Sequence, residues 1–208
     1  MSPLALAQLC ADIYTITDGF TVYDCDGVYL GHANIDNCDV FVFRGSANTE
    51  DWLDDFYAIP LKDPALGVVH SGMHRGVPEA YLWIKHMLSM LPQPDDVILT
   101  GHSLGGAHAR LMAGLLAADK NPATQLVTFG SPKPGCQLLK ELVAATVEHL
   151  SYRHCEDIVP TLPPDIFGYV HTEPWIELGQ DPDSGILEPA SDHSIHRYVE
   201  ALGNPDGA

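Results

Sequence analysis

Ser103 stands between two glycines, in the run Gly-His-Ser-Leu-Gly at 101–105. In this G-x-S-x-G spacing a serine can serve as a nucleophile, because a sharp turn from a strand into a helix lifts its hydroxyl above a sheet. The two glycines let the strand and the helix approach closely. A glycine-rich turn with a capping serine is the alternative. The flanking sequence favours the nucleophile, since an apolar run at 97–99 precedes it and apolar residues at helical spacing follow it over 104–116.

A serine nucleophile needs a base and a carboxylate to activate it. His193, at a loop-to-helix junction near the chain end, is the predicted base, and His196, one turn into the helix, is the rival. Asp157 lies in a loop after a strand beyond the serine and is the predicted carboxylate. The order Ser103, Asp157, His193 is that of α/β-hydrolases and differs from the orders in chymotrypsin and subtilisin. We expect His193 to take the serine proton during attack on an ester carbonyl, and Asp157 to hold the imidazole tautomer.

The negative oxygen that forms in such an attack is stabilised by hydrogen-bond donors. The first expected donor is the backbone amide of Leu104, the residue after the nucleophile. The second is expected from the loop that follows the apolar run 40–43, where we predict Ser46 through its amide and its hydroxyl. A plain strand-ending turn is the alternative for this loop. The chemistry needs neither a metal nor an organic cofactor.

The elements that must position these residues alternate between strands and helices through the centre of the chain. Predicted strands cover 40–43, 97–99, 126–129 and 147–154, and predicted helices cover 77–91, 104–116 and 136–146. This alternation predicts an α/β fold, a mostly parallel sheet flanked by helices, in a single domain over residues 1–208. The remaining predicted elements are a packing helix over 4–16, a hairpin at 21–32, a late strand pair within 167–178 and a last helix opened by 191–193.

A short amphipathic helix is predicted just after the Ser46 loop, capped by Asn48. Trp52, Leu53 and Phe56 share its apolar face. Such a helix can act as a lid over an apolar substrate cleft. A fixed structural helix that docks on the core is the alternative, and the residues leave both interpretations open.

Histidine and cysteine spacing gives little support for a metal site. His70 and His74 are four residues apart, but no third ligand stands nearby and a glycine lies between them, so packing or hydrogen bonding is the preferred role. The five cysteines form no CxxC pair and leave one over in any full pairing. We therefore expect reduced, mostly buried thiols.

The charge balance excludes several classes of partner. Asp and Glu total 28 against 10 Lys and Arg, a formal net charge of −18, so nucleic acid and anionic membrane surfaces are repelled. The first residues lack the basic segment of a signal peptide, and no stretch has the length of a transmembrane helix. These observations predict a soluble protein that is not exported by a signal peptide, either cytoplasmic or released by another route.

Six sequence blocks in register resemble the class 3 lipases, the fungal-lipase-like branch of the α/β-hydrolases. They are Phe-Arg-Gly-Ser at 43–46 with Trp52 following, Val-His-x-Gly at 69–72, Gly-His-Ser-Leu-Gly-Gly at 101–106, Thr-Phe-Gly-Ser-Pro at 128–132, Asp-x-Val-Pro-x-Leu-Pro-Pro at 157–164, and Asp-His at 192–193. The chain departs from the family pattern at Cys136, where Asn is common, and at His196, where an aromatic residue is common.

The resemblance implies Ser103, Asp157 and His193 as the catalytic triad, Ser46 and Leu104 as the oxyanion hole, and Trp52 in a lid region. The expected function is a serine carboxylic-ester hydrolase, a lipase or esterase that acts on acyl esters such as acylglycerols. Its partner is a small-molecule or lipid ester, with at most transient contact with a lipid interface. Two alternatives remain open, namely transfer of the acyl group to an alcohol other than water and a non-catalytic binding protein on the same fold.

Overall fold

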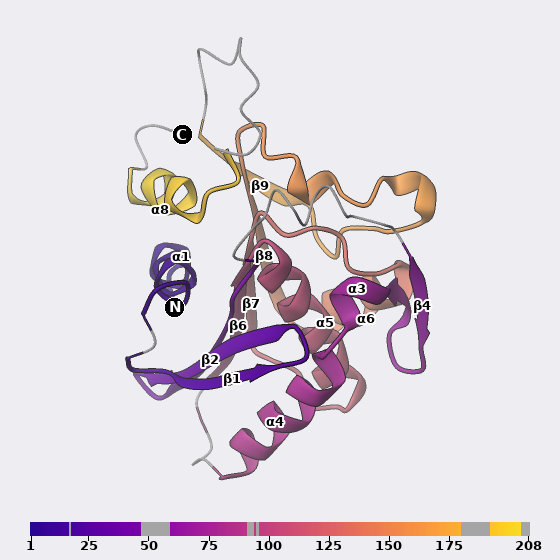
Figure 1. Cartoon of the computed structure of the whole chain (residues 1–208), viewed down its shortest axis with the longest axis horizontal. Coiled ribbons are helices and arrows are strands. Elements are labelled where there is room, and N and C mark those ends of the chain that lie inside the picture. The colour runs from indigo at the N-terminus through magenta and orange to yellow at the C-terminus, as the bar shows by residue number, and fades with distance from the viewer. Residues whose placement is uncertain (17, 47–58, 91–93, 95, 180–191, 205–208) are drawn as a thin grey trace.

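A seven-stranded sheet forms the centre of the molecule (Figure 1). The computed structural model describes residues 1–16, 18–46, 59–90, 94, 96–179 and 192–204. The strand order is β1-β2-β3-β6-β7-β8-β9. The bounds are β1 Thr21–Cys25, β2 Val28–Ile35, β3 Cys38–Phe43, β6 Asp96–His102, β7 Gln125–Phe129, β8 Glu148–His154 and β9 Trp175–Leu178. β1, β2 and β3 are antiparallel neighbours, whereas every pairing from β3 to β9 is parallel, as the alternation of strands and helices predicts.

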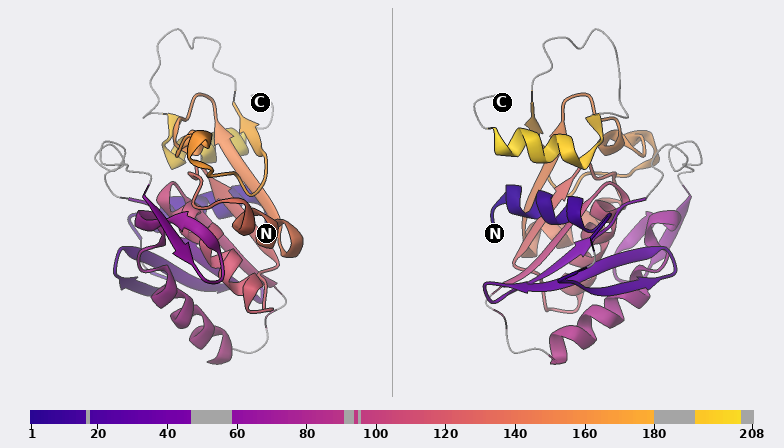
Figure 2. Two further views of the ribbon diagram at one scale, coloured as in Figure 1. Left: turned by 90° about the vertical axis from the view of Figure 1, so that its right-hand side faces the viewer. Right: turned by 60° about the vertical axis from the view of Figure 1, so that its left-hand side comes forward.

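Helices cover both faces of the sheet because the buried strands are apolar on both sides. In β3, Val40 and Val42 pack with α1 (Pro3–Asp12) and α8 (Ile195–Gly203), which lie side by side (Figure 2). The alternate residues Phe41 and Phe43 face the opposite layer. That layer contains α4 (Val77–Met90), α5 (Leu104–Ala118) and α6 (Gln137–Thr146). The helices predicted at 77–91, 104–116 and 136–146 are thus present with ends shifted by a residue or two.

A small two-stranded sheet, β4 (Pro60–Asp63) and β5 (Gly67–His70), leads into the short helix α3 (Ser71–His74). The side chain of His70 caps α3, because its Nδ1 accepts from the backbone amide of Met73 at 3.3 Å. His74 Nε2 lies 2.9 Å from the Asp63 carboxylate. Both histidines therefore have hydrogen-bonding roles, the role preferred for His70 from the sequence.

The prediction for residues 167–178 was wrong in one respect. A strand pair was expected there, but β9 is the single strand of this segment. Short 3-10 helices cover Val159–Thr161 and Asp165–Phe167, and Gly168 turns the chain at a left-handed φ of +80°. Val170 then donates its amide to the carbonyl of Gly135 rather than to a neighbouring strand, so tertiary contacts replace the second strand.

The last helix begins at Ile195, with Ser194 at its N-cap, and not at 191–193 as predicted. His193 consequently lies in the connection just before α8. The predicted lid helix with Trp52, Leu53 and Phe56 lies outside the described residues, as does Ser191. None of the five cysteines forms a disulfide. Only Cys10 is buried, so the prediction of mostly buried thiols was wrong. Among the described helices, none is both long and apolar enough to cross a bilayer.

Candidate active site

Ser103 occupies the sharp turn between β6 and α5, and its backbone is strained. Its φ of +57° and ψ of −131° are values that residues with side chains rarely adopt and that cluster at functional sites. The two flanking glycines permit the turn. A Cβ on Gly105 would lie 2.1 Å from the carbonyl oxygen of Phe43, and one on Gly101 would lie 2.4 Å from Gly105. Side chains at either position would therefore push strand and helix apart.

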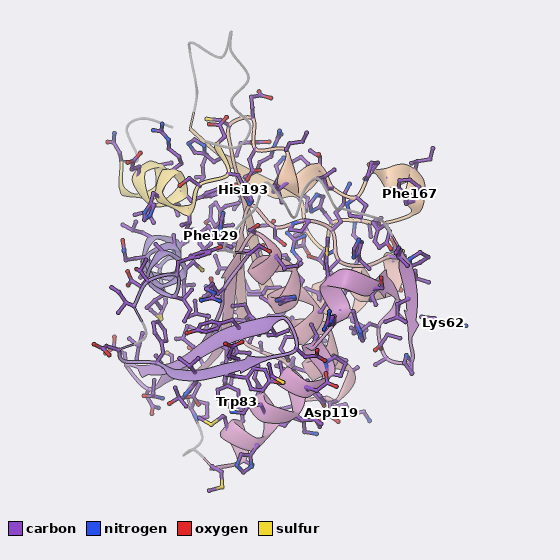
Figure 3. All side chains as sticks on the ribbon, in the orientation of Figure 1. Lys62, Trp83, Asp119, Phe129, Phe167 and His193 are labelled. Carbon is purple, nitrogen blue, oxygen red and sulfur yellow. The ribbon has the colours of Figure 1, made fainter. Side chains whose placement is uncertain are left out.

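The end of β7 brings the predicted triad together. The Ser103 amide donates to the carbonyl of Phe129 at 3.0 Å. The next residue, Gly130, has a φ of +56°, and a Cβ there would lie 2.7 Å from Asp157 Oδ2 and 3.0 Å from His193 Cε1. Ser103, Asp157 and His193 thus lie around the Phe129–Gly130 peptide. Figure 3 labels two of these residues, Phe129 and His193. Gly130 leaves the space that the carboxylate and the imidazole occupy.

Asp157 is fully buried and each of its oxygens is hydrogen-bonded. Oδ2 accepts from His193 Nδ1 at 2.8 Å and from the Tyr198 hydroxyl at 2.5 Å. Oδ1 accepts from the backbone amide of Val159 at 2.9 Å. Because His193 donates from Nδ1, its Nε2 is left as the proton acceptor in the neutral ring, which is the tautomer a general base needs.

Tyr198 connects α8 to this carboxylate. Burial, followed by the neighbouring Asp157 charge, raises the pKa of Tyr198 well above its usual value, so the hydroxyl keeps its proton and donates it. The same oxygen accepts from the amide of His154 at 3.1 Å. Tyr198 therefore ties the last helix, the end of β8 and Asp157 into one arrangement.

His102, the residue before the nucleophile, positions His193 from the other side. Its Nε2 donates to the backbone carbonyl of His193 at 2.7 Å, and the two rings lie 4.7 Å apart between centroids. Its Nδ1 accepts from the Tyr14 hydroxyl at 3.1 Å. Burial, followed by the nearby His193, lowers the pKa of His102 well below its usual value. His102 is therefore neutral at pH 7, as these two hydrogen bonds require.

Two atoms of the predicted triad have no hydrogen-bond partner within the described part of the chain. They are Ser103 Oγ and His193 Nε2, both buried. A buried polar atom without a partner is costly, and such atoms occur where a substrate or a reaction step completes the bonding. The rival base His196 is exposed on α8, one residue beyond Ile195. The carboxylate of Asp157 thus bonds His193 and not His196.

The expected oxyanion donors border a common cavity. Leu104 is the first residue of α5, so its amide has no acceptor within the helix, and the positive end of the helix dipole lies there. Ser46 follows β3 in the neighbouring loop and is half-buried. Both residues line a cavity of about 170 Å³. An anionic oxygen placed between Ser103 and these residues would meet the partial positive charge at the start of α5.

One group of side chains could hold a metal ion. His154, Cys155 and Asp192 each offer a ligand atom, and these atoms lie within 4.8 Å of one another. A nitrogen, a sulfur and an oxygen ligand suit a borderline cation such as zinc. The group lies beside the triad, but the acyl chemistry of a serine, a histidine and an aspartate does not call for a metal.

Sequence reasoning missed the residues that support the triad. Tyr14 and Tyr198 carry no motif, because their hydroxyls reach His102 and Asp157 only after α1 and α8 have packed on the sheet. Gly130 lies within the block Thr-Phe-Gly-Ser-Pro at 128–132, and a glycine directly after a buried strand was the available signal for a close approach. His102 lies inside the Gly-His-Ser-Leu-Gly motif, but the sequence indicated no role for its side chain.

Comparison with known proteins places this geometry in a family. The family model described as lipase (class 3) matches residues 40–167, more than half of the chain. The chain belongs to the class 3 lipase family. A class 3 relative, the secreted mono- and diacylglycerol lipase 1 of Fusarium solani, is 34% identical over 161 residues, which cover 74% of this chain and 48% of the relative. The lipase of Rhizomucor miehei is 31% identical over 171 residues, with 74% and 46% covered.

The class 3 lipase fold extends beyond the matched segment. A solved structure of the Rhizomucor miehei lipase with its propeptide superposes with a TM-score of 0.72 at 23% identity, over 96% of this chain and 78% of that one. The predicted α/β-hydrolase fold is thereby confirmed. This chain nevertheless spans about half the length of the curated relatives it matches.

The prediction of a protein that is not exported was wrong. It depended on the first residues of the given sequence alone. The relative from Fusarium solani is named a secreted lipase, and two Penicillium relatives that are 29% identical carry the same description. These names contradict the predicted cytoplasmic location.

Proposed function

We infer that this chain is a serine carboxylic-ester hydrolase, of the lipase or esterase type, that acts through an acyl-enzyme on neutral acyl esters. The observation that carries the inference is the hydrogen bond of 2.8 Å between Asp157 and His193 Nδ1, which leaves Nε2 as an acceptor beside the strained Ser103. The family membership supports the same reaction. The net charge of −18 favours an uncharged ester over an anionic one.

In the first half-reaction, Ser103 Oγ attacks the ester carbonyl carbon while His193 Nε2 takes the hydroxyl proton. The carbonyl oxygen becomes an oxyanion, and the amides of Leu104 and Ser46 donate to it. Asp157 stabilises the imidazolium through Nδ1 and does not itself take a proton. When the tetrahedral adduct collapses, the carbon–oxygen bond to the alcohol breaks, and the alcohol leaves with the proton from Nε2.

In the second half-reaction, water takes the place of the alcohol. His193 Nε2 removes a proton from water as its oxygen attacks the acyl carbon, and the same donors hold the second oxyanion. Collapse returns the proton to Ser103 Oγ and releases the carboxylic acid. Each residue has the same role in both half-reactions. We therefore propose one catalytic domain that uses Ser103, Asp157, His193, Ser46 and Leu104 without a cofactor.

Labelling with a serine-directed phosphonate tests this function directly. The phosphonate is expected to add once, at Ser103, and mass spectrometry of a tryptic digest locates the adduct. Ser103→Ala is expected to show no labelling, and Asp157→Asn is expected to slow the labelling strongly. A protein that binds ligands on this fold without turnover would leave Ser103 unlabelled, which would refute the proposal.

A panel of p-nitrophenyl esters with acyl chains from two to sixteen carbons then measures hydrolysis. Turnover is expected for wild type, with loss in Ser103→Ala of about 10⁶-fold, the scale seen when a triad serine is removed. Ser103→Ala is also the control for spontaneous hydrolysis. If wild type and Ser103→Ala released nitrophenol at the same rate with every ester, ester hydrolysis would be excluded.

A further inference from the structure

The group formed by His154, Cys155 and Asp192 lies where the ends of β8 and β9 meet the start of α8 (Figure 1). His154 ends β8, Cys155 follows it, and Asp192 lies in the connection before α8. One nitrogen, one sulfur and one oxygen of these side chains lie within 4.8 Å of one another. The proposed ester hydrolysis uses none of the three side chains, so their grouping needs another explanation.

The separations within this group are close to those around a bound zinc ion. The Cys155 sulfur lies 3.7 Å from His154 Nε2, and Asp192 Oδ1 lies 3.7 Å from His154 Nδ1. In a tetrahedral zinc site with bonds of about 2.0–2.3 Å, the ligand atoms lie about 3.3–3.7 Å from one another. The thiol, the carboxylate and one imidazole nitrogen would therefore need to move by only about an ångström to bind one ion.

The His154 ring suits a metal ligand better than an ion-pair partner. Its side chain is 12% exposed, and its Nδ1 is buried without a hydrogen-bond partner among the described residues. At 3.7 Å the Asp192 carboxylate is too far away to accept a hydrogen bond from this nitrogen. A buried polar atom without a partner is costly, and a neutral imidazole offers a lone pair to a metal ion. A cation between the ring and the carboxylate would satisfy both groups.

The backbone around the group leaves room for the thiol and the imidazole. Gly179 has a φ of +76°, and a Cβ there would lie 3.0 Å from the Cys155 sulfur and 3.1 Å from His154 Nε2. Cys155 itself has a φ of +39°, which residues with side chains rarely adopt. Its amide donates to the Leu178 carbonyl at 3.0 Å, which holds this turn against β9. A glycine at 179 thus permits the two ligand side chains to lie side by side.

The charges and ligand types of the group match a divalent zinc ion. A thiolate and a carboxylate carry two negative charges and a neutral imidazole carries none, so the ion and its three ligands together are neutral. The Cys155 thiol gives its proton to solvent as the zinc–sulfur bond forms. Sulfur and nitrogen ligands favour zinc over calcium and magnesium, which prefer oxygen ligands. The net charge of −18 also attracts cations to the protein surface.

We propose that His154, Cys155 and Asp192 form a zinc site, with water in the fourth position of the tetrahedron. The site joins two segments that carry members of the predicted triad, because Asp157 is two residues beyond Cys155 and His193 directly follows Asp192. A bound ion therefore stabilises the folded protein at this junction, and it takes no part in the ester chemistry. The proposal goes beyond the hydrolase function and does not depend on it.

Zinc and cobalt binding to the whole chain tests the proposal. Competition with a chromophoric chelator measures the zinc affinity of wild type, Cys155→Ser, Asp192→Asn and Cys136→Ser. Cys136→Ser is the matched control, because Cys136 is also a half-buried thiol but does not belong to the group. Cobalt(II) in place of zinc gives a thiolate-to-metal charge-transfer absorption, which reports the bond to sulfur. Thermal unfolding with and without zinc measures the stabilisation.

Wild type and Cys136→Ser are expected to bind one zinc ion with the same affinity. Their melting temperatures are expected to rise by about 5 °C when free zinc is about a hundred times Kd. Cys155→Ser and Asp192→Asn are expected to bind zinc at least about 100-fold more weakly, since loss of a mere outer-shell partner costs about 10–100-fold. The cobalt charge-transfer absorption is expected to disappear in Cys155→Ser and to persist at higher cobalt concentration in Asp192→Asn.

Absence of zinc binding by wild type would overturn the proposal. Equal zinc affinity in all four proteins would overturn it as well, because the ion would then lie elsewhere. Asp192→Asn keeps an oxygen for the Glu156 amide, which donates to Asp192 Oδ2 at 3.3 Å, so this variant tests the site even if Cys155→Ser does not fold. Neither result bears on the hydrolase function, which the phosphonate and the ester panel test separately.

Discussion

Two buried polar regions lie along helix α5, one at its start and one near its middle, and they differ in how completely their atoms are paired. At its start, Ser103 Oγ and His193 Nε2 are buried without partners among the described residues, beside a strained backbone. Two turns later the fully buried Arg110 points toward β7 and β8, where its terminal nitrogens reach Ser151 Oγ at 2.7 Å and Thr128 Oγ1 at 3.3 Å. In the first region the atoms without partners are those of the predicted reaction, whereas the second is largely closed by hydrogen bonds, with only Arg110 Nε and His171 Nε2 left without a partner among the described residues.

The Arg110 cluster extends through histidines that stay neutral. Arg110 lies 3.2 Å from His171 Nδ1, and His149 bridges Thr128 Oγ1 at 3.1 Å and Thr172 Oγ1 at 2.9 Å. Burial lowers the pKa of Arg110 to about 9, and no described carboxylate compensates its charge. The hydroxyls of Thr128 and Ser151 and the neutral ring of His171 must therefore replace the water that the buried guanidinium has lost. The difference between the regions teaches that catalysis is expected to depend on the unpaired atoms and stability on the paired ones.

Removal of His193 is expected to give the largest effect on activity. His193→Ala leaves Ser103 without a base and is expected to lower kcat/KM by about 10⁴-fold or more, while the melting temperature stays within a few degrees of wild type. His196→Ala, its matched control on the exposed face of α8, is expected to change kcat/KM less than twofold. Ester hydrolysis and thermal unfolding measure both effects. Near-normal rates in His193→Ala with loss in His196→Ala would reverse the assignment of the base.

Loss of Arg110 is expected to affect stability instead. Arg110→Met removes a buried cation but leaves Ser151, Thr128 and His171 without its donors, so the free energy of unfolding is expected to fall by about 3–5 kcal/mol. The kcat of the folded fraction is expected to stay within about threefold of wild type. Urea unfolding followed by circular dichroism gives the free energy, and active-site titration gives the folded fraction. A stable variant without activity would show that the cluster serves the reaction.

The grouping of Ser103, Asp157 and His193 was predictable from the sequence because each has a local signal or a fixed place in the chain order. Ser103 lies in a motif that strand and helix patterns flank, and Asp157 and His193 follow in α/β-hydrolase order. Tyr198 and Arg110 had no such signal, since the partner of a tyrosine hydroxyl or of a buried guanidinium is decided by which helices pack on which strands. The strand pair expected within 167–178 failed for a similar reason, because β9 pairs with β8 alone and Val170 bonds Gly135.

Acid is expected to lower the free energy of unfolding through protonation of His171, which belongs to the Arg110 cluster. Burial, followed by the charges of Arg110 and Lys133, lowers the pKa of His171 to about 3. The unfolded chain binds a proton there near pH 6.5 and the folded chain does not, so the contribution of His171 to stability is complete above pH 6.5 and is lost as the pH falls toward 3. Because His171 is partly exposed, we expect a contribution of about 2 kcal/mol to be lost between pH 7 and pH 4.

His171→Gln tests this pH dependence, since glutamine keeps an acceptor for Arg110 but does not titrate. Urea unfolding at pH 7 and pH 4 is the measurement. Wild type is expected to lose about 2 kcal/mol more than His171→Gln between the two pH values, because the titration of all other groups is common to both proteins. Equal losses in the two proteins would exclude His171 as the sensitive group.

Tyr198 shares a feature with each region. Its hydroxyl is hydrogen-bonded, as in the Arg110 cluster, but the acceptor is Asp157 of the predicted triad. Tyr198→Phe removes the donor 2.5 Å from Asp157 Oδ2 and is expected to lower kcat about tenfold with KM nearly unchanged, because Asp157 is then held by fewer bonds while the cavity walls stay intact. The expected loss of stability is about 1 kcal/mol. Tyr169→Phe is the matched control, because the buried Tyr169 hydroxyl has no hydrogen-bond partner in the described chain. It is expected to leave kcat unchanged. If Tyr198→Phe lost stability but kept kcat, the hydroxyl would be structural, and the orientation of Asp157 would depend on Val159 and His193 alone.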